Sequence, residues 1–286
     1  MTLKQRPQVI APALYTIGSG LSTYTGAALA LSLFALFEPS FVAWLRVLCA
    51  GLILILISGF KPQLLRGPQA KYIIAYGISM VSMNVCFYNA IDSIPLGTAV
   101  AIEFLGPIVV GAIASRTPKH LIALACSAGG VLCISGAQWT QNASGILFAL
   151  GAATGWAVYI AIGLRLAQHM NGTQQQTRQI LGLALCIGAL AATPIAYLVR
   201  PDSFGTAPMS VVGLALTLAL LATVVPSICD FNAMRLASPQ LYAILTALMP
   251  LVATLCGAVM LGQVLSGIEV AGTLLIVGAV LLRREA

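Results

Sequence analysis

Charged side chains are scarce in this sequence of 286 residues. It contains 14 Lys or Arg and 7 Asp or Glu, which together make 7% of the chain, whereas 59% of its residues are hydrophobic. A soluble domain carries about 25% charged residues, so the composition excludes a soluble protein and predicts an integral membrane protein. The net charge of +7 does not indicate nucleic-acid binding, which needs basic residues clustered on one exposed face.

Metal-ligand, nucleotide and catalytic motifs are also lacking. The two histidines, His120 and His169, have no ligand partners at a recognisable spacing, and all seven cysteines fall within apolar runs, where Cys packs as a small hydrophobic residue. The sequence has no Walker-type glycine loop, and no Ser/His pair or Asp-rich motif at membrane depth. We therefore expect no metal site, no cofactor, no disulfide and no enzymatic activity.

Long apolar runs dominate what is present. A transmembrane helix needs about 20 apolar residues, whereas the strands of a membrane barrel alternate over about ten. The continuous runs predict an all-α integral membrane protein with ten transmembrane helices, near residues 9–31, 38–58, 71–91, 95–115, 119–137, 144–165, 178–199, 210–232, 239–261 and 265–282.

The positive residues orient these spans. Basic residues next to transmembrane helices stay in the cytoplasm. In the ten-span arrangement only Arg200 lies on the second side and Arg46 lies inside a span, which predicts cytoplasmic N and C termini. Twelve basic residues share the first side: Lys4, Arg6, Lys61, Arg66, Lys71, Arg116, Lys119, Arg165, Arg178, Arg235, Arg283 and Arg284.

The two halves of the chain resemble each other. An offset of 143 residues, half the length, aligns Asn89-Ala90 with Asn232-Ala233, Pro107 with Pro250 and Gly129 with Gly272. This similarity predicts two five-helix repeats, residues 1–142 and 143–286. Because five is odd, the second repeat enters the membrane from the opposite side, and inverted repeats of secondary transporters carry the substrate site at their interface.

Pro107 and Pro250 occupy equivalent positions in the two repeats. Proline removes one helical hydrogen bond, so each releases the carbonyl of the residue four positions earlier, Glu103 or Thr246. A free carbonyl inside a bilayer must be satisfied by a neighbouring helix, water or substrate. We interpret both prolines as hinges that border a substrate cavity; the alternative is that each produces a simple kink.

Two charges lie deep within predicted spans, where charges are rare and usually functional. Glu103 and Arg46 lie at similar depth. They could form a structural salt bridge, or they could face the cavity, where Arg46 would attract a carboxylate and Glu103 would attract an ammonium group or carry a proton. Asp230 lies closer to a helix end, and we expect it to pair with Arg235.

Polar and aromatic residues accompany these charges. Asn84 lies at nearly the same depth, and Tyr88 follows it on the same helical face at i+4. Trp156 and Tyr159 are three residues apart and lie nearer the membrane core than an interfacial aromatic belt would. They are candidates for a cavity wall or for core packing.

The segment "PLGTAVAIEFLGP", with "LRVLCAGLILI" before it and "GAATGWAVYI" after it, resembles the drug/metabolite transporter superfamily, in particular EamA-type permeases of the threonine/homoserine exporter branch. The resemblance implies two inverted five-helix repeats in the bacterial inner membrane and export of small metabolites. Where the family often has Glu, this chain has Met249 and Gln263. Family-like positions are Arg46, Asn84, Tyr88, Glu103, Gly106, Pro107, Trp156, Tyr159 and Pro250.

These observations predict a secondary transporter that exports amino acids such as threonine and homoserine, or other zwitterions, by alternating access. Its partners would be a small-molecule substrate and the lipid bilayer, with protons as candidate coupling ions. Facilitated diffusion is equally compatible with the sequence. The alternative within the superfamily is an exporter or facilitator of drugs, aromatic compounds or other metabolites.

Overall fold

The chain folds into a bundle of α-helices. The computed structural model describes residues 6–114, 118–168, 173–201, 209–237, 239–246, 249–263 and 266–281. Its elements are α1 (Arg6–Phe34), α2 (Pro39–Ser58), the 3-10 turn η1 (Pro62–Leu65), α3 (Ala70–Ser93), α4 (Leu96–Glu103), α5 (Leu105–Ala114), α6 (Pro118–Gln168), α7 (Gln174–Leu198), α8 (Met209–Ala219), the π-helical turn η3 (Leu220–Val224), α9 (Val225–Leu236), α10 (Pro239–Thr246), α11 (Met249–Leu261) and α12 (Gly267–Leu281).

Six segments in the described part of the chain are long and apolar enough to cross a membrane. They are Ile10–Phe34, Pro39–Ser58, Ala70–Ser93, Asn142–Ala167, Gln174–Leu198 and Val211–Leu236, and shorter apolar helices cover Leu96–Gly111 and Val252–Leu261. Their outer faces present large apolar side chains, among them Leu56, Leu198 and Val259, each 83% exposed. Such exposure suits lipid and would be unfavourable in water.

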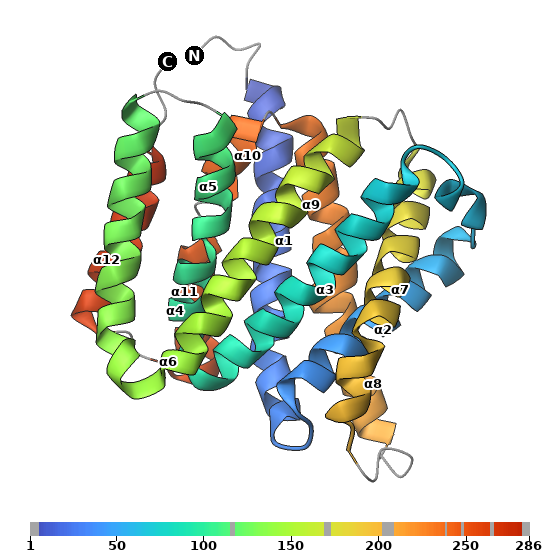
Figure 1. Ribbon diagram of the computed structural model, residues 1–286, viewed down its shortest axis with the longest axis horizontal. Coiled ribbons are helices and arrows are strands. Elements are labelled where there is room, and N and C mark those ends of the chain that lie inside the picture. The colour runs from blue at the N-terminus through green and yellow to red at the C-terminus, as the bar shows by residue number, and fades with distance from the viewer. Residues whose placement is uncertain are drawn as a thin grey trace.

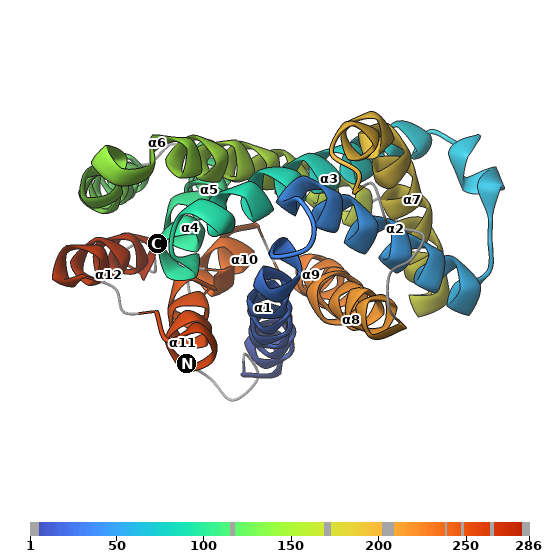
Figure 2. The same cartoon turned by 90° about the horizontal axis from the view of Figure 1, so that it is seen from below.

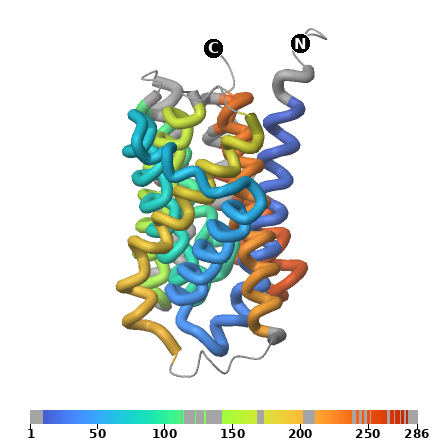
Figure 3. Tube along the Cα trace, turned by 90° about the vertical axis from the view of Figure 1, so that its right-hand side faces the viewer, coloured from blue at the N-terminus to red at the C-terminus, as the bar shows by residue number. Residues whose placement is uncertain are grey.

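The helices run along a roughly common direction (Figures 1 and 3) and form two rows (Figure 2). The perpendicular view shows α6, α3 and α7 along one side, and α12, α11, α1, α9 and α8 along the other (Figure 2). α3 packs against α6 and α7, and α1 packs against α9 and α11. The short pair α4 and α5 lies between the rows and contacts α11 and α10 respectively.

Local sequence explains several helix ends. α2 begins with Pro39 at its first turn, where proline costs no hydrogen bond because the first N–H groups have no helical partner. It ends at Gly59, whose φ of 87° is accessible to glycine without steric cost. α7 begins after Thr173, whose hydroxyl accepts from Gln176 N at 3.3 Å, a normal N-terminal cap.

Two apolar segments are interrupted inside the bundle. The predicted single span over 95–115 is two helices, because α4 ends at Glu103 and α5 begins at Leu105. The break lies one turn before Pro107, as loss of the proline N–H predicts. At Gly106, an added Cβ would collide with the backbone oxygen of Ala153 in α6. Only glycine therefore allows this close approach of α5 to α6.

The segment over 211–236 contains a wider turn that the sequence analysis did not predict. Val225 N bonds back to Leu220 O across the π-helical turn η3, directly before Pro226. Pro226 cannot donate to Ala222, four residues earlier, and the wider turn accommodates its ring. α6 is likewise bent at Asn142, whose φ and ψ are −154° and 68°, where the sequence predicts a boundary between two spans.

Candidate functional site

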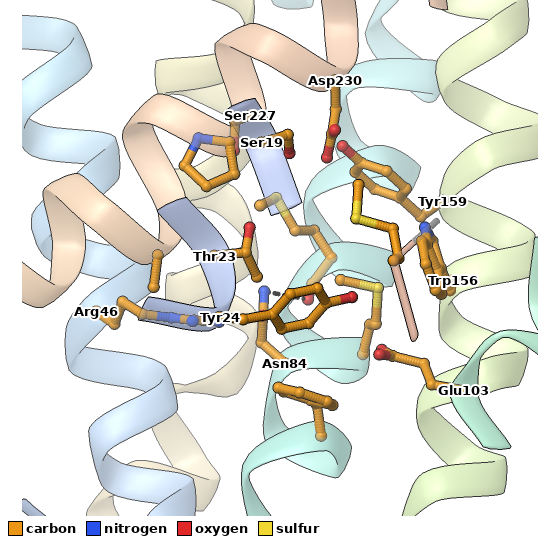
Figure 4. A pocket seen from close by; sticks show the side chains of 16 residues that line it. Ser19, Thr23, Tyr24, Arg46, Asn84, Glu103, Trp156, Tyr159, Ser227 and Asp230 are labelled. Atoms are coloured by element: carbon orange, nitrogen blue, oxygen red, sulfur yellow. Dashed lines mark hydrogen bonds between the residues drawn. The ribbon is translucent and has the colours of Figure 1, made fainter. Parts of the chain in front are cut away.

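A cavity lies at the centre of the bundle, where α1, α2, α3, α4, α6, α9, η3 and α11 meet (Figure 4). The volume of the cavity that is open to the centres of water molecules is about 70 Å³, which is room for several waters. The floor and walls are partly apolar, with Met80, Met83 and Phe87 from α3. Its polar side chains are Ser19, Thr23, Tyr24, Arg46, Asn84, Glu103, Tyr159, Ser227 and Asp230.

Arg46 reaches the cavity from α2 and is held by two neutral residues of α3. Its Nη1 donates to Tyr88 Oη at 2.7 Å, its Nη2 donates to Asn84 Oδ1, and its Cζ lies 4.3 Å from the centre of the Tyr88 ring. Asn84 Nδ2 donates to Met80 O at 2.8 Å, which orients the amide oxygen toward Arg46. The i,i+4 placement of Asn84 and Tyr88 is confirmed: both contact one guanidinium.

Arg46 is 2% exposed, and its Nε has no hydrogen-bond partner. A buried charge-bearing donor without a partner is energetically costly, so an additional acceptor would stabilise this group. Among the described residues, none of its bonds goes to a carboxylate. Arg46 is thus positioned by neutral partners and keeps its positive charge uncompensated by direct contact.

Glu103 is the last residue of α4 and projects into the same cavity (Figure 4). It is 6% exposed. In the described part of the chain its carboxylate has no hydrogen bond or ion pair, although it is within electrostatic range of Arg46. The structure therefore does not contain the Arg46–Glu103 salt bridge that the sequence left open as one of two interpretations.

Asp230 corrects an expectation. It does not pair with Arg235; it lines the central cavity, next to Ser19. Five residues on a helix correspond to a rotation of about 140°, so Asp230 and Arg235 point in different directions from α9. The Oδ1 atom of Asp230 is buried and has no hydrogen-bond partner, as is Oγ of Ser227 one turn earlier.

An aromatic layer adjoins Asp230. Tyr159 of α6 lines the cavity, and Tyr76 Oη donates to Tyr159 Oη at 2.8 Å. The Tyr76 ring also packs edge-on against Phe231 at 6.5 Å between ring centres. All three residues are at most 2% exposed. Trp156, also in the wall, contacts Phe104 at the helix break with 6.2 Å between ring centres, so both predicted aromatic candidates face the cavity.

The remaining predicted residues lie outside the lining. Tyr88 contacts Arg46 without lining the cavity. Thr246 is fully buried at the end of α10. Pro107 lies one turn beyond the α4–α5 break, Pro250 is in the first turn of α11, and neither lines the cavity. Residues 247 and 248 lie outside the described chain, as does His169, and nothing is described of the His120 side chain.

Several cavity residues were not among the predicted site residues: Ser19, Thr23, Tyr24, Ser227, Asp230 and Met249. The repeat offset of 143 contains a signal for two of them. This offset aligns Ser227 with Asn84 and Asp230 with Phe87 in the sequence, and all four residues line the cavity. The three α1 residues have no comparable signal, because small hydroxyl residues and tyrosine are common in helix packing.

No group of three or more potential metal ligands occurs among the described residues. The Cys49, Cys86, Cys186, Cys229 and Cys256 thiols are free. The site contains a buried positive group, two buried carboxylates and several hydroxyls around a small cavity. This arrangement suits reversible binding of a charged small molecule.

Comparison with known proteins identifies relatives over nearly the whole chain. The model of the EamA-like transporter family matches residues 143–283. The threonine/homoserine exporter RhtA of Escherichia coli strain K12 is 32% identical over 286 residues, covering 98% of this chain and 92% of that protein. RhtA of Salmonella typhimurium strain LT2 is 32% identical over 274 residues, covering 94% and 89%.

A crystal structure of another protein is 20% identical and superposes with a TM-score of 0.67, covering 96% of this chain and 97% of its own, which shows a shared fold. The relatives named above are exporters and not enzymes. Together with the apolar helices, they show a multi-pass protein of the bacterial inner membrane. The chain belongs to the EamA-like transporter family of the drug/metabolite transporter superfamily.

Proposed function

We propose that this exporter carries small zwitterionic amino acids, threonine or homoserine among them, by alternating access. The relatives at 32% identity are named threonine/homoserine exporters, which supports this substrate class. The observation that carries the proposal is that Arg46 and Glu103 face one cavity without bonding to each other. A zwitterion has both charges that such a site leaves uncompensated.

The proposed binding mode assigns the substrate carboxylate to Arg46. Its guanidinium is already oriented by Asn84 and Tyr88, so less side-chain freedom is lost on binding. Its Nε is unpaired and can donate to an incoming oxygen. Glu103 faces the substrate ammonium or carries a proton. Trp156 and Tyr159 form the wall. Thr246 occupies the position of the second repeat that is equivalent to Glu103.

The proposed motion relates two inverted five-helix repeats, residues 1–142 and 143–286, with ten spans and cytoplasmic termini. Reciprocal packing supports this arrangement. α4 packs on α11 as α5 packs on α10; α1 packs on α9 as α6 packs on α3; α3 packs on α7 as α8 packs on α2. In each of these three comparisons, replacing both helices of one contact by their equivalents in the other repeat gives the second contact.

Aromatic walls favour a second candidate substrate class. Phe87, Trp156 and Tyr24 line the cavity, and aromatic side chains pack well against aromatic ligands. An aromatic or drug-like compound exported by the same route is therefore the alternative.

Proton antiport and facilitated diffusion differ in whether an imposed pH gradient drives accumulation of the substrate.

Uptake into inside-out vesicles tests the proposal. Vesicles that contain the protein should accumulate labelled threonine and homoserine faster than vesicles without it, and Arg46→Gln should abolish the difference. The control is Arg66→Gln, an exposed arginine between η1 and α3, which should leave uptake unchanged. A matched set of labelled aromatic compounds tests the alternative. Normal uptake of aromatic compounds without amino-acid uptake would replace the first proposal by the second.

A further inference from the structure

A second polar group of the cavity is built by α1 and α9. Ser227 and Asp230 are three residues apart on α9, so they share one helical face, and Ser19 of α1 lies within hydrogen-bonding reach of the Asp230 carboxylate. Figure 4 shows the three side chains together at one end of the cavity, with Arg46 and Glu103 away from them. We call Ser19, Ser227 and Asp230 the α1–α9 cluster.

The α1–α9 cluster has oxygen atoms without partners. Ser227 is 1% exposed and its Oγ is unbonded, and Oδ1 of Asp230 is buried and unbonded. Buried polar atoms are nearly always satisfied in proteins. The unsatisfied oxygens therefore point to a ligand that supplies donors, and a carboxylate inside a membrane protein calls for a positive one.

An ammonium group matches this set of atoms. It carries one positive charge and three N–H donors, and the cluster offers three oxygens, Oδ1 of Asp230 and the hydroxyl oxygens of Ser227 and Ser19. Glu103 lies away from these three oxygens, on the side of Trp156 (Figure 4).

We propose that the α1–α9 cluster is the subsite for the ammonium group of the transported zwitterion, with Asp230 as its anionic contact. This inference rests on the proposed function and refines it. The substrate would lie across the cavity, its carboxylate on Arg46 of α2 and its ammonium on Asp230 of α9. The two contacts come from different proposed repeats, so substrate binding would draw the repeats together. Glu103 is then left to carry a proton.

Calorimetric binding to the full-length protein in lipid nanodiscs tests the subsite. The ligands are threonine and 2,3-dihydroxybutyrate, which replaces the ammonium by a hydroxyl. The unsubstituted protein should prefer threonine by about tenfold or more, as expected for a charge-assisted contact. Asp230→Asn should bind the two ligands about equally. Ser227→Ala should weaken threonine binding several-fold and leave dihydroxybutyrate binding unchanged.

The matched control is Asp92→Asn, the same chemical change at an exposed position of α3 outside the cavity, which should keep the full preference for threonine. Gel filtration and thermal unfolding establish that each variant is folded. If Asp230→Asn and Ser227→Ala keep the preference for threonine, the subsite is wrong while amino-acid transport stands. If the unsubstituted protein binds no amino acid, both proposals are overturned.

Discussion

At the scale of single residues, the arginine of the cavity depends on neutral neighbours. Arg46 is fixed by Asn84 and Tyr88, which leaves its charge for a ligand. A salt bridge with Glu103 would instead compensate the positive charge that the proposed binding mode reserves for the substrate carboxylate. In the proposed binding mode, the absence of that contact leaves the guanidinium to the substrate, at the cost of burying an uncompensated charge.

Arg46→Lys should lower threonine transport by about tenfold or more while the protein still inserts. Lysine keeps the positive charge but cannot donate to Asn84 and Tyr88 in the planar geometry of arginine, and a hydrogen bond to a charged group contributes about 1.5–3 kcal/mol. Initial rates of labelled threonine uptake in proteoliposomes measure the effect, with protein content per liposome as the reference.

The pairing of Arg46 and Glu103 is tested by the same assay with neutral substitutions. Because the two side chains do not contact each other, combining Arg46→Gln with Glu103→Gln should not restore folding or transport. Recovery of both properties in the double variant would show that a salt bridge forms in the membrane.

Sequence reasoning works best at this scale where burial and helical spacing agree. Arg46, Asn84 and Glu103 could be predicted because charged and amide groups are rare in apolar helices, and Tyr88 because it is four residues from Asn84. For Asp230, closeness in sequence to Arg235 predicts an ion pair that the structure does not contain. Only the rotation of α9 and the helices opposite it, which the local sequence does not encode, turn Asp230 inward.

At the scale of helices, interruptions position the polar groups. Glu103 ends α4 next to the break before Pro107, and Ser227 and Asp230 follow the π-helical turn before Pro226. The first break could be predicted from proline chemistry. The π-helical turn could not, because proline is also compatible with a kink, and packing decides between them.

Pro107→Ala should preserve insertion and slow transport. Alanine restores an N–H that can bond to the carbonyl of Glu103, which favours one continuous helix over the α4–α5 break and can add about 0.5–1.5 kcal/mol to stability. We expect an unchanged or higher unfolding temperature and a turnover lower by about tenfold, equivalent to about 1.4 kcal/mol in the barrier. Thermal unfolding and threonine uptake measure the two effects.

The control for this change is Pro194→Ala in α7, which also has a proline inside a helix but contributes nothing to the cavity lining. Its turnover should stay close to that of the unsubstituted protein. A normal turnover in Pro107→Ala would identify the α4–α5 break as a simple kink and remove Pro107 from the proposed hinge pair.

At the scale of the whole molecule, the loop after α11 joins the proposed repeats. Oε1 of Gln263 accepts from Leu96 N, the first residue of α4, at 3.0 Å, so a residue from the second half caps a helix of the first. The composition established a membrane protein, and the long apolar runs indicated most helices. This cap could not be predicted, because it joins residues 167 positions apart.

Reporter fusions should show cytoplasmic termini. A fluorescent protein joined after Ala286 should be fluorescent, and alkaline phosphatase joined after Pro201, next to Arg200 at the other end of the bundle, should be active. The physical reason is that positive residues next to transmembrane helices stay in the cytoplasm. Phosphatase joined after Lys61 should be inactive, and the opposite pattern at all three positions would reverse the proposed orientation.

The hydrogen bond between Tyr76 and Tyr159 lies beside the cavity that contains Asp230 and bears on how the substrate-free transporter would treat protons. A bacterial membrane is energised, and a continuous watery path past Asp230 and Glu103 would let protons leak and dissipate the potential. Tyr76, Tyr159 and Phe231 form a layer of uncharged, packed side chains beside this cavity. Such a layer, if kept in place without substrate, would limit the water that reaches Asp230 and so limit proton leakage through the empty transporter.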